Sequence, residues 1–254
     1  MGGMQEEHAP WPTRPARARL TTFLAATEAE VQEAQRLRYR VFAEEMGADL
    51  PERDRGLDRD DFDPWCDHLL VRDDETGEVV GTYRILPGSR ASRLGRFYSE
   101  SEFNLHGVRA LPGLVEVGRA CVHPDYRHGG VISLLWAGLM TYLAAHDHAH
   151  VIGCASIPVT DGGRAAASIC RELLTRHLSP AAWRVRPHVP FAFETLGYDP
   201  TTPLPVLIKG YVRLGAYACG PPAWDPHFRT ADILLLLPLA EVNPRYVRRL
   251  SRAA

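Results

Sequence analysis

The stretch LVEVGRACVHPDYRHGG, residues 114–130, begins as a β-strand and ends as a glycine-containing turn before an apolar run at 131–146. Alternate residues of a regular strand face opposite sides of a sheet, an arrangement that separates Glu116 from Arg119. A bulge at Gly118, where no Cβ obstructs the backbone, changes this alternation and brings both charges toward one side. Because bulges are frequent beside active sites, the stretch predicts a charged site on this strand.

The turn that follows this strand indicates a phosphate site. Free backbone N–H groups and the helix dipole favour an anion at the start of a helix, and the turn adds the basic side chains Arg127 and His128. An ordinary connecting loop is the alternative interpretation of the same residues. For the phosphate site we expect the residues Val122, Arg127, His128, Gly129 and Gly130.

The flanking segments predict an α/β fold with a mixed, mostly antiparallel twisted sheet and helices on both faces. Thr27 and Glu30 form a capping-box pattern at the start of a helix that reaches about Met46 and stops at Gly47. The turn DETG at 74–77 predicts a hairpin. We expect parallel pairing around the helix at 131–146. The other expected elements are strands at about 19–26, 68–73, 78–87, 114–122, 150–157 and 233–239, and a helix at about 163–177.

The composition is that of an ordinary globular protein. The chain has 254 residues, 45% hydrophobic and 24% charged, and its formal net charge of −2 gives no overall attraction to nucleic acid. Five scattered cysteines without a CxxC pair indicate neither a disulfide framework nor a zinc site, which fits a reducing cytoplasm. No run approaches the roughly 20 apolar residues of a membrane-spanning helix. We expect a flexible basic arm at 1–19 and a single domain at 20–254.

The strand and turn together resemble the GNAT superfamily of N-acetyltransferases, in which a turn of the form Gln/Arg-x-x-Gly-x-Gly/Ala holds the phosphate of an acyl carrier. Arg127 and Gly130 match the first and fourth positions of that pattern. Ile132 departs at the sixth position, where the superfamily has a tiny residue so that the backbone can approach a diphosphate. This departure argues against coenzyme A as the acyl donor.

A closer resemblance covers nearly the whole chain after the arm. The chain is similar to the acyl-carrier-protein-dependent ornithine N-acyltransferases, which make lyso-ornithine lipid. The matching stretches are AQRLRYRVFAEEMGA, DDFDPWCDHLLVRD, VVGTYRIL, FYSESEFNL, VEVGRACVHPDYR, GCASI, LIKGYVRLGAYACGPPAWDPHFRTAD and NPRY. Val159 is a departure, because the family usually has Gly at that position.

This resemblance implies transfer of a 3-hydroxyacyl group from acyl carrier protein to the α-amine of ornithine, with a family-specific C-terminal extension at about 181–254. It implies no tightly bound cofactor, since the acyl-phosphopantetheine of the carrier is a co-substrate. We expect no metal and no nucleic-acid partner. Acceptors such as glycine, lysine or glutamine, which need only a few changes in the pocket, remain alternatives, and so does a catalytically idle lipid- or carrier-binding protein.

The chain also resembles the acyl-homoserine lactone synthases, which makes such a synthase another alternative. Shared charged and aromatic positions imply the substrate-binding residues Arg38, Phe42, Asp60, Asp63 and Arg84, with structural ion pairs as the alternative role of the charged ones. The synthases have Trp where this chain has Ala48. Both groups transfer an acyl chain from a carrier with a single phosphate, which agrees with a relaxed phosphate turn.

Amide formation requires a neutral amine, and an α-amine is only about 10–20% neutral at pH 7. Glu116 is the candidate general base, and a salt bridge with Arg119 is its structural alternative. Arg119 is the second candidate catalytic residue, with an organising role. Ser156 or water is the candidate donor of a proton to the leaving thiolate, and we include Ser156 among the substrate-binding residues.

An apolar wall for the fatty chain is expected from Phe97, Phe103, Leu135, Trp136 and Leu139, although ordinary core is the alternative for each. Basic residues near both ends suggest docking of an acidic carrier protein or peripheral contact with an anionic membrane at its inner face, and solvated tails are the alternative. These residues are Arg14, Arg17, Arg19, Arg245, Arg248, Arg249 and Arg252.

Overall fold

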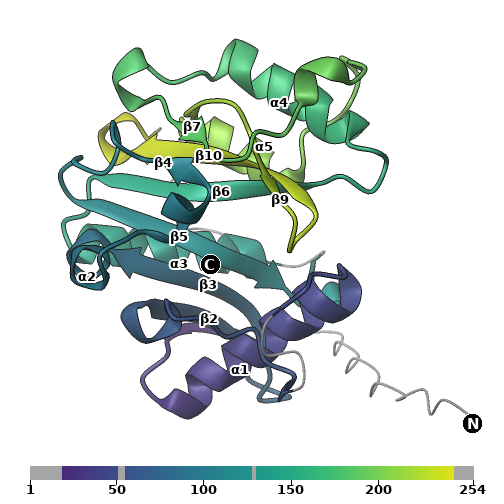
Figure 1. Cartoon of the computed structure of the whole chain (residues 1–254). Helices are drawn as coiled ribbons and strands as arrows, with labels where there is room; N and C mark the ends of the chain where they lie inside the picture. The colour runs from purple at the N-terminus through teal and green to yellow at the C-terminus, as the bar shows by residue number, and fades with distance from the viewer. Residues whose placement is uncertain (1–18, 51–54, 128–129, 243–254) are drawn as a thin grey trace, which may run out of the picture.

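The computed structural model describes residues 19–50, 55–127 and 130–242. Their centre is a twisted sheet with the strand order β1-β2-β3-β5-β6-β10-β8 (Figure 1). The bounds are β1 Leu20–Leu24, β2 Asp67–Asp73, β3 Val79–Pro87, β5 Leu114–Val122, β6 His150–Pro158, β8 Tyr217–Ala218 and β10 Thr230–Pro238. β9 (Ala223–Asp225) also pairs with β10, and β4 (Phe103–Asn104) forms a separate small sheet with β7 (Arg186–Pro187).

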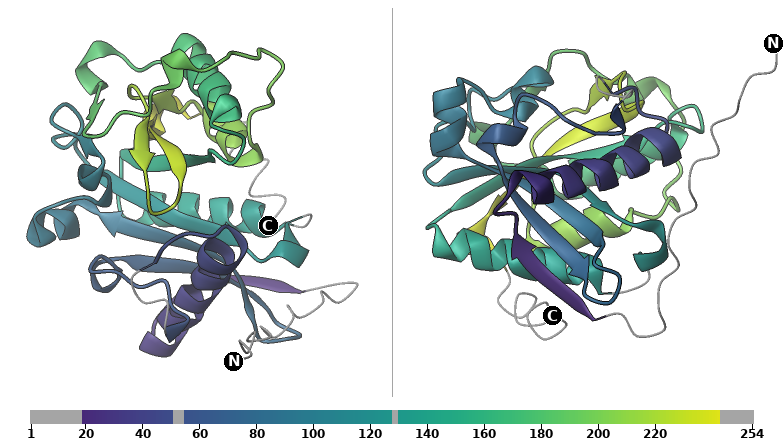
Figure 2. Two further views of the ribbon diagram at one scale, coloured as in Figure 1. Left: turned by 45° about the vertical axis from the view of Figure 1, so that its right-hand side comes forward. Right: turned by 90° about the horizontal axis from the view of Figure 1, so that it is seen from below.

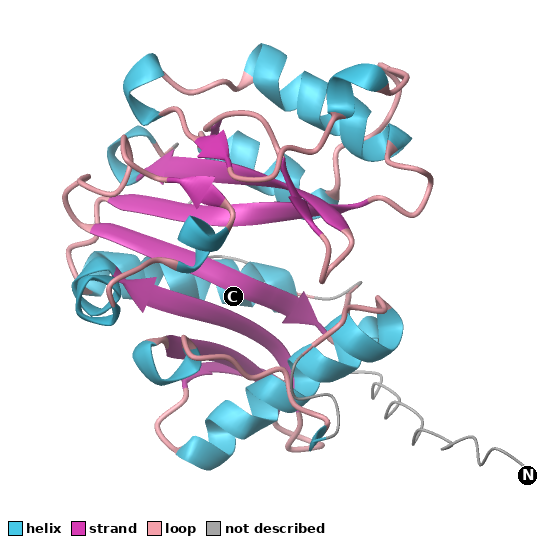
Figure 3. Cartoon of the chain, in the orientation of Figure 1, coloured by secondary structure: helices cyan, strands magenta, loops and turns pink. Residues whose placement is uncertain are grey.

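Helices cover both faces of this sheet, as the views in Figures 2 and 3 show. The longer helices are α1 Glu28–Tyr39, α2 Gly88–Leu94, α3 Val131–Ala145, α4 Arg164–Arg176 and α5 Val206–Leu214. A π-helix at Arg40–Glu45 extends α1. Short 3-10 turns lie at Asp63–Trp65, Tyr98–Ser101, Pro124–Tyr126, Ala181–Trp183, Phe193–Thr195 and Leu239–Glu241.

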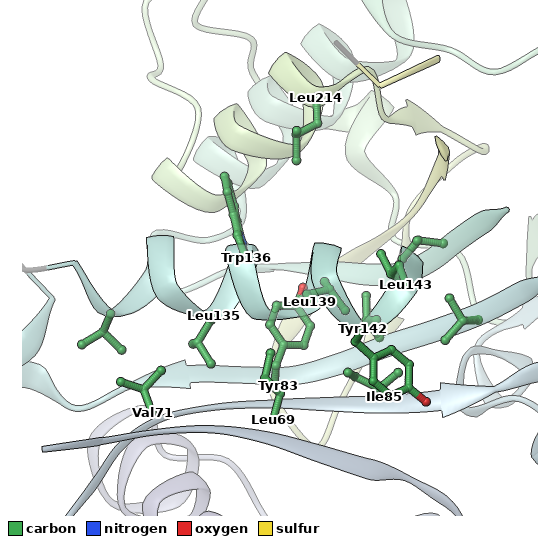
Figure 4. Packing of buried hydrophobic residues seen from close by; sticks show 14 of the residues in the cluster. Leu69, Val71, Tyr83, Ile85, Leu135, Trp136, Leu139, Tyr142, Leu143 and Leu214 are labelled. Carbon is green, nitrogen blue, oxygen red and sulfur yellow. The ribbon is translucent and has the colours of Figure 1, made fainter. Parts of the chain in front are cut away.

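The alternation of β2 shows which helices share a face. Leu70 packs with α1, whereas Leu69 and Val71 pack with α3 on the opposite side (Figure 4). On β10, Ile233 and Leu235 pack with α4 and α5, so these two helices lie on the α3 side. The sheet therefore has an α1 face and an α3 face, and both faces carry a hydrophobic core.

The predicted start and end of the first helix are confirmed. The Oγ1 of Thr27 accepts the N–H of Glu30 at 3.3 Å, and the Glu30 carboxylate accepts the N–H of Thr27 at 3.1 Å, so the capping box is formed. The helix ends at Gly47, whose φ of 74° is one that glycine adopts readily. β5 pairs in parallel with β6, and among the described residues every other pair of named strands is antiparallel.

The predicted fold class is confirmed, and the sheet continues past residue 181 because β8, β9 and β10 complete it. α2, α5 and the short strands are additions that the sequence did not predict. Residues 1–18 of the expected arm lie outside the described residues. Within the described part of the chain, the longest apolar helices are too short to cross a membrane.

Candidate active site

The central feature of the site is the place where β5 and β6 separate. Their pairing ends at Glu116 opposite Ile152, and one residue later a Cβ on Gly153 would lie 2.4 Å from the carbonyl oxygen of Val117. Beyond this close contact the two strands line a cavity of about 600 Å³. Its lining includes Phe42 from the α1 side and Leu139 from the α3 side, so the cavity passes through the gap in the sheet.

A β-bulge directs the charged side chains of β5 toward the α1 face. Thr82 lies opposite Cys121 and Arg84 opposite Gly118, so two residues of β5 face the single residue between them on β3. Arg119 occupies the bulge with a φ of 50°. Cys121 then packs with α1, which confirms the predicted change of alternation, although the bulge lies just after Gly118 rather than at it.

Glu116 is buried at the wall of the cavity. One carboxylate oxygen accepts the backbone N–H of Tyr98 at 2.6 Å, and the other accepts the backbone N–H of Ser99 at 2.8 Å and the hydroxyl of Ser99. Burial raises the pKa of Glu116, and these three hydrogen bonds offset part of that effect. Among the described residues Glu116 forms no ion pair with Arg119, so the salt bridge that was the structural alternative for this carboxylate is not formed.

An arginine–aspartate network, in which guanidinium groups and carboxylates compensate one another, lies beside the cavity, and two of its members, Arg84 and Arg119, line it. Arg38 pairs with Asp58 at 2.9 Å and with Asp63 at 2.9 Å. Arg84 pairs with Asp60 at 2.6 Å and with Asp63 at 3.1 Å. The members are Arg38, Arg84, Arg119, Asp58, Asp60 and Asp63.

Arg119 connects the network to the residues that hold Glu116. It pairs with Asp58 at 3.2 Å, and its terminal nitrogen donates to the hydroxyl of Tyr98 at 3.2 Å. The guanidinium also lies over the rings of Tyr98 and Phe228, with distances of 4.8 and 4.7 Å to their centroids. Since the amide of Tyr98 binds Glu116, these contacts give Arg119 the position of an organising residue.

The network lowers the pKa of its aspartates. Burial alone would raise the pKa of Asp60 and Asp63, but the arginines outweigh it: Arg84 and Arg119 for Asp60, and Arg38 and Arg84 for Asp63. Arg38 is fully buried and, like Asp60 and Asp63, is not part of the cavity lining, so the geometry favours the structural role for these three. Arg84 and Phe42 line the cavity, where the predicted contact with substrate stays a prediction.

A second charged group, which we call the acidic wall, consists of Glu102, Asp225 and Asp232, of which the two aspartates line the cavity. Asp232 accepts the hydroxyl of Ser156 at 3.0 Å and that of Thr230 at 2.6 Å. A carboxylate oxygen of Glu102, one of Asp232 and the Cys154 sulfur lie within 4.8 Å of one another. No Lys or Arg of the described ranges forms an ion pair with any of the three carboxylates.

The acidic wall is electrostatically unlike the network. Burial, together with the neighbouring Asp232 and Asp225, raises the pKa of Glu102. Burial likewise raises the pKa of Asp232, and the hydrogen bonds from Thr230 and Ser156 offset only part of that shift. These carboxyl groups therefore resist losing their protons unless a cation joins them.

On the α3 face the cavity continues as an apolar arm between α3 and α5. Side chains from both helices line it, and a Cβ on Gly210 of α5 would lie 1.7 Å from the indole of Trp136, so the helices pack closely beside it. Of the predicted acyl wall, Trp136 and Leu139 line the cavity, whereas Phe97, Phe103 and Leu135 belong to the surrounding core. The lining of the arm is Ile132, Trp136, Leu139, Met140, Leu207, Tyr211 and Leu214.

The predicted phosphate turn is described in part, because His128 and Gly129 lie outside the described residues. Arg127 pairs with both carboxylate oxygens of Glu45 at 2.6 and 2.7 Å and donates to the carbonyl oxygen of Val122 at 3.1 Å. Gly130 is the N-cap of α3 and supplies no side chain to cap it. Among the described residues no side chain caps the first N–H groups of this helix, and the phosphate site stays a prediction.

Several residues of the site were not predicted as such. Tyr98 and Ser99 lie in the stretch FYSESEFNL, and Asp58 lies in the acidic segment before Asp60, so the sequence contained a signal for their neighbourhood. Glu102 and Asp232 are far apart in sequence and come together only through the fold. Of the basic terminal residues, only Arg19 is within the described ranges, where it pairs with Asp74 at 3.7 Å.

Comparisons with known proteins agree with this architecture. A family model described as an acetyltransferase (GNAT) domain matches residues 37–137. Over 247 residues the chain is 39% identical to the L-ornithine N(alpha)-acyltransferase of Rhizobium meliloti, a match that covers 91% of this chain and 83% of that protein. It is 38% identical over 250 residues to the protein of the same name from Agrobacterium fabrum, covering 90% and 84%.

Among solved structures, the chain is similar to a CoA-dependent acyl-homoserine lactone synthase with SAM and isopentyl-CoA. The TM-score is 0.55 at 16% sequence identity, covering 93% of this chain and 90% of the other. At this identity the likeness concerns the fold, and the GNAT-like architecture expected from the sequence is confirmed.

Proposed function

The chain belongs to the family of L-ornithine N(alpha)-acyltransferases, and we propose that it transfers a fatty acyl group from acyl carrier protein to the α-amine of ornithine. The observation that carries this proposal is the cavity through the gap between β5 and β6, which joins a charged chamber to an apolar arm. An amide-forming N-acyltransferase needs both parts, because the amine is polar and the acyl chain is not. The product is a lyso-ornithine lipid.

Glu116 is the general base of this proposal. Its raised pKa makes the carboxylate a better proton acceptor near neutral pH, and it lies at the cavity wall where the ammonium group of ornithine would enter. The neutral amine then attacks the thioester carbonyl, and the amide bond forms as the carbon–sulfur bond breaks. The thiolate takes a proton from Ser156 or from water, and the proton that the attacking nitrogen releases replaces it. Arg119 positions Tyr98, and through its amide Glu116.

The acyl carrier is proposed to bind through the single phosphate of its phosphopantetheine at the start of α3. The uncapped N–H groups after Gly130 support this placement, and Arg127, three residues before Gly130 in the chain, supplies a basic side chain that pairs with Glu45. The 3-hydroxyl of the acyl group, the carrier protein and peripheral membrane contact are expectations from the family. The basic residues invoked for membrane contact lie almost entirely outside the described ranges.

The purified chain, incubated with ornithine and acyl carrier protein that bears a 3-hydroxyacyl group, should form acylated ornithine, which mass spectrometry detects. Glu116→Gln should lower kcat by about 10²–10⁴-fold, while its thermal unfolding stays cooperative. Glu75→Gln, an exposed acid on the β2–β3 turn, is the matched control and should be fully active. A lactone formed with S-adenosylmethionine, or full activity of Glu116→Gln, would contradict the proposal.

A further inference from the structure

The acidic wall lies in the same cavity as the proposed base. Asp225 and Asp232 line that cavity together with Glu116. A carboxylate oxygen of Glu102 lies within 4.8 Å of Asp232 and of Cys154, which is also part of the lining. Whatever amino acid reaches Glu116 therefore lies beside this wall.

This wall lacks a counter-ion. Glu102 Oε2 is buried and accepts no hydrogen bond from the described residues, and none of the three carboxylates has an ion-pair partner there. The arginines nearest to the cavity are already bound, because Arg84 and Arg119 pair with Asp58, Asp60 and Asp63. Buried carboxyl groups in this situation must take up protons or pair with a cation that enters from outside.

A short series of side-chain contacts connects the base to the acidic wall. Ser99 donates its hydroxyl to Glu116, and the Cys154 sulfur lies 3.6 Å from the same Ser99 oxygen. One serine and one cysteine thus separate Glu116 from the acidic wall. The two amino nitrogens of an extended ornithine are about 6 Å apart, from standard bond lengths.

On the basis of the proposed function, we propose that the acidic wall binds the side-chain ammonium of the acceptor amino acid while the α-amine of that amino acid lies at Glu116. Asp232 is the central ligand, since it lines the cavity and is fixed by the hydroxyls of Ser156 and Thr230. Glu102 and Asp225 complete the negative site. The wall is thus the specificity determinant that separates a cationic acceptor from an uncharged one.

Norvaline is the test ligand, because it has the carbon chain of ornithine and lacks only the terminal ammonium. A site built around a polar group rejects an analogue without that group by about 10⁴-fold. The native chain should therefore show a kcat/KM for ornithine about 10⁴-fold above that for norvaline. Asp232→Asn and Glu102→Gln should each lose at least 100-fold with ornithine and keep or raise the value for norvaline.

The outcomes separate this inference from the proposed function. If the native chain acylates neither amino acid, the proposed function fails. If it acylates ornithine and both variants keep the native preference over norvaline, the acidic wall is not the ammonium site. Thermal unfolding of each variant, and of Asp232→Ala as a second substitution at that position, tests whether the chain is folded. A folded variant must also retain acylation of norvaline.

A divalent cation is the other ligand that Glu102, Cys154 and Asp232 could hold. Chain freed of metal by EDTA should keep full activity toward ornithine. Loss of activity on chelation, with recovery on adding Zn²⁺ or Mn²⁺, would instead assign the three groups to a metal and overturn the ammonium site. Glu75→Gln again serves as the control that leaves the ornithine to norvaline ratio unchanged.

Discussion

The arginine–aspartate network and the acidic wall each contain three acidic residues, but only the network contains cations. In the arginine–aspartate network every carboxylate has a guanidinium partner within 3.5 Å. In the acidic wall none of the three has such a partner among the described residues. The charges of the network are compensated within the chain and stabilise the fold, whereas those of the acidic wall are the ones that we propose a ligand compensates.

Removing a cation from the arginine–aspartate network should have the largest effect on the fold. Arg38→Ala removes one of the two guanidinium partners of each of the buried carboxylates Asp58 and Asp63, and should lower the free energy of unfolding by about 3–5 kcal/mol. Urea unfolding at pH 7 measures it. Arg176→Ala, which removes an exposed pair with Glu172, is the control and should cost about 0.5 kcal/mol or less. A loss below 1 kcal/mol for Arg38→Ala would show that the network does not support the fold.

Substitution of the glycines near which β5 and β6 separate should have a smaller effect on the free energy of unfolding. The Cβ of Gly153→Ala would meet the carbonyl oxygen of Val117, so the variant should lose about 1–3 kcal/mol in urea unfolding. The Cβ of Gly118→Ala would enter open space in the cavity, so its free energy of unfolding should change by no more than about 0.5 kcal/mol. Equal losses at both positions would place the separation of the strands elsewhere.

The network and the acidic wall should also change the stability of the fold with pH in opposite directions. The pKa of Asp63 is lowered in the folded chain, so its stabilising contribution is present above pH 4 and is lost on acidification. The pKa of Asp232 is raised, so the folded chain loses stability as pH rises above about 4.

Asp232→Asn removes that second titration. Between pH 4 and pH 7 the free energy of unfolding of this variant, relative to the native chain, should therefore rise by on the order of 1 kcal/mol. Urea unfolding at the two pH values measures the shift. A constant difference between variant and native chain would mean that Asp232 is ionised in both states across this range.

Much of the fold followed from residues that act locally. β5 was predicted with its observed bounds, and the capping box at Thr27 and the stop at Gly47 were confirmed, because caps and alternation depend on neighbours in sequence. α2 was missed because GSRASRL is short and polar and its cap residue Pro87 supplies no side-chain hydrogen bond. The two-residue strands β4, β7 and β8 are too short to produce a periodic pattern.

The site was predictable where its residues share one strand. The bulge that brings Glu116 and Arg119 toward one side of β5 was predicted from a glycine in the same segment, and their catalytic roles stay predictions. The donors that hold Glu116 are mainly backbone amides, which every residue has, so no residue type identifies Tyr98 and Ser99 in advance. The acidic wall requires β10 to pair with β6, a long-range contact that neither segment encodes alone.

The opening through the sheet has a consequence for turnover. If the proposed function holds, the finished lipid has its head on the α1 face and its hydrocarbon on the α3 face, with the backbones of β5 and β6 on either side of its middle. Such a molecule can leave only along its own long axis. Each added methylene then lengthens the path of withdrawal, so product departure, rather than bond formation, should come to limit the rate as the chain grows.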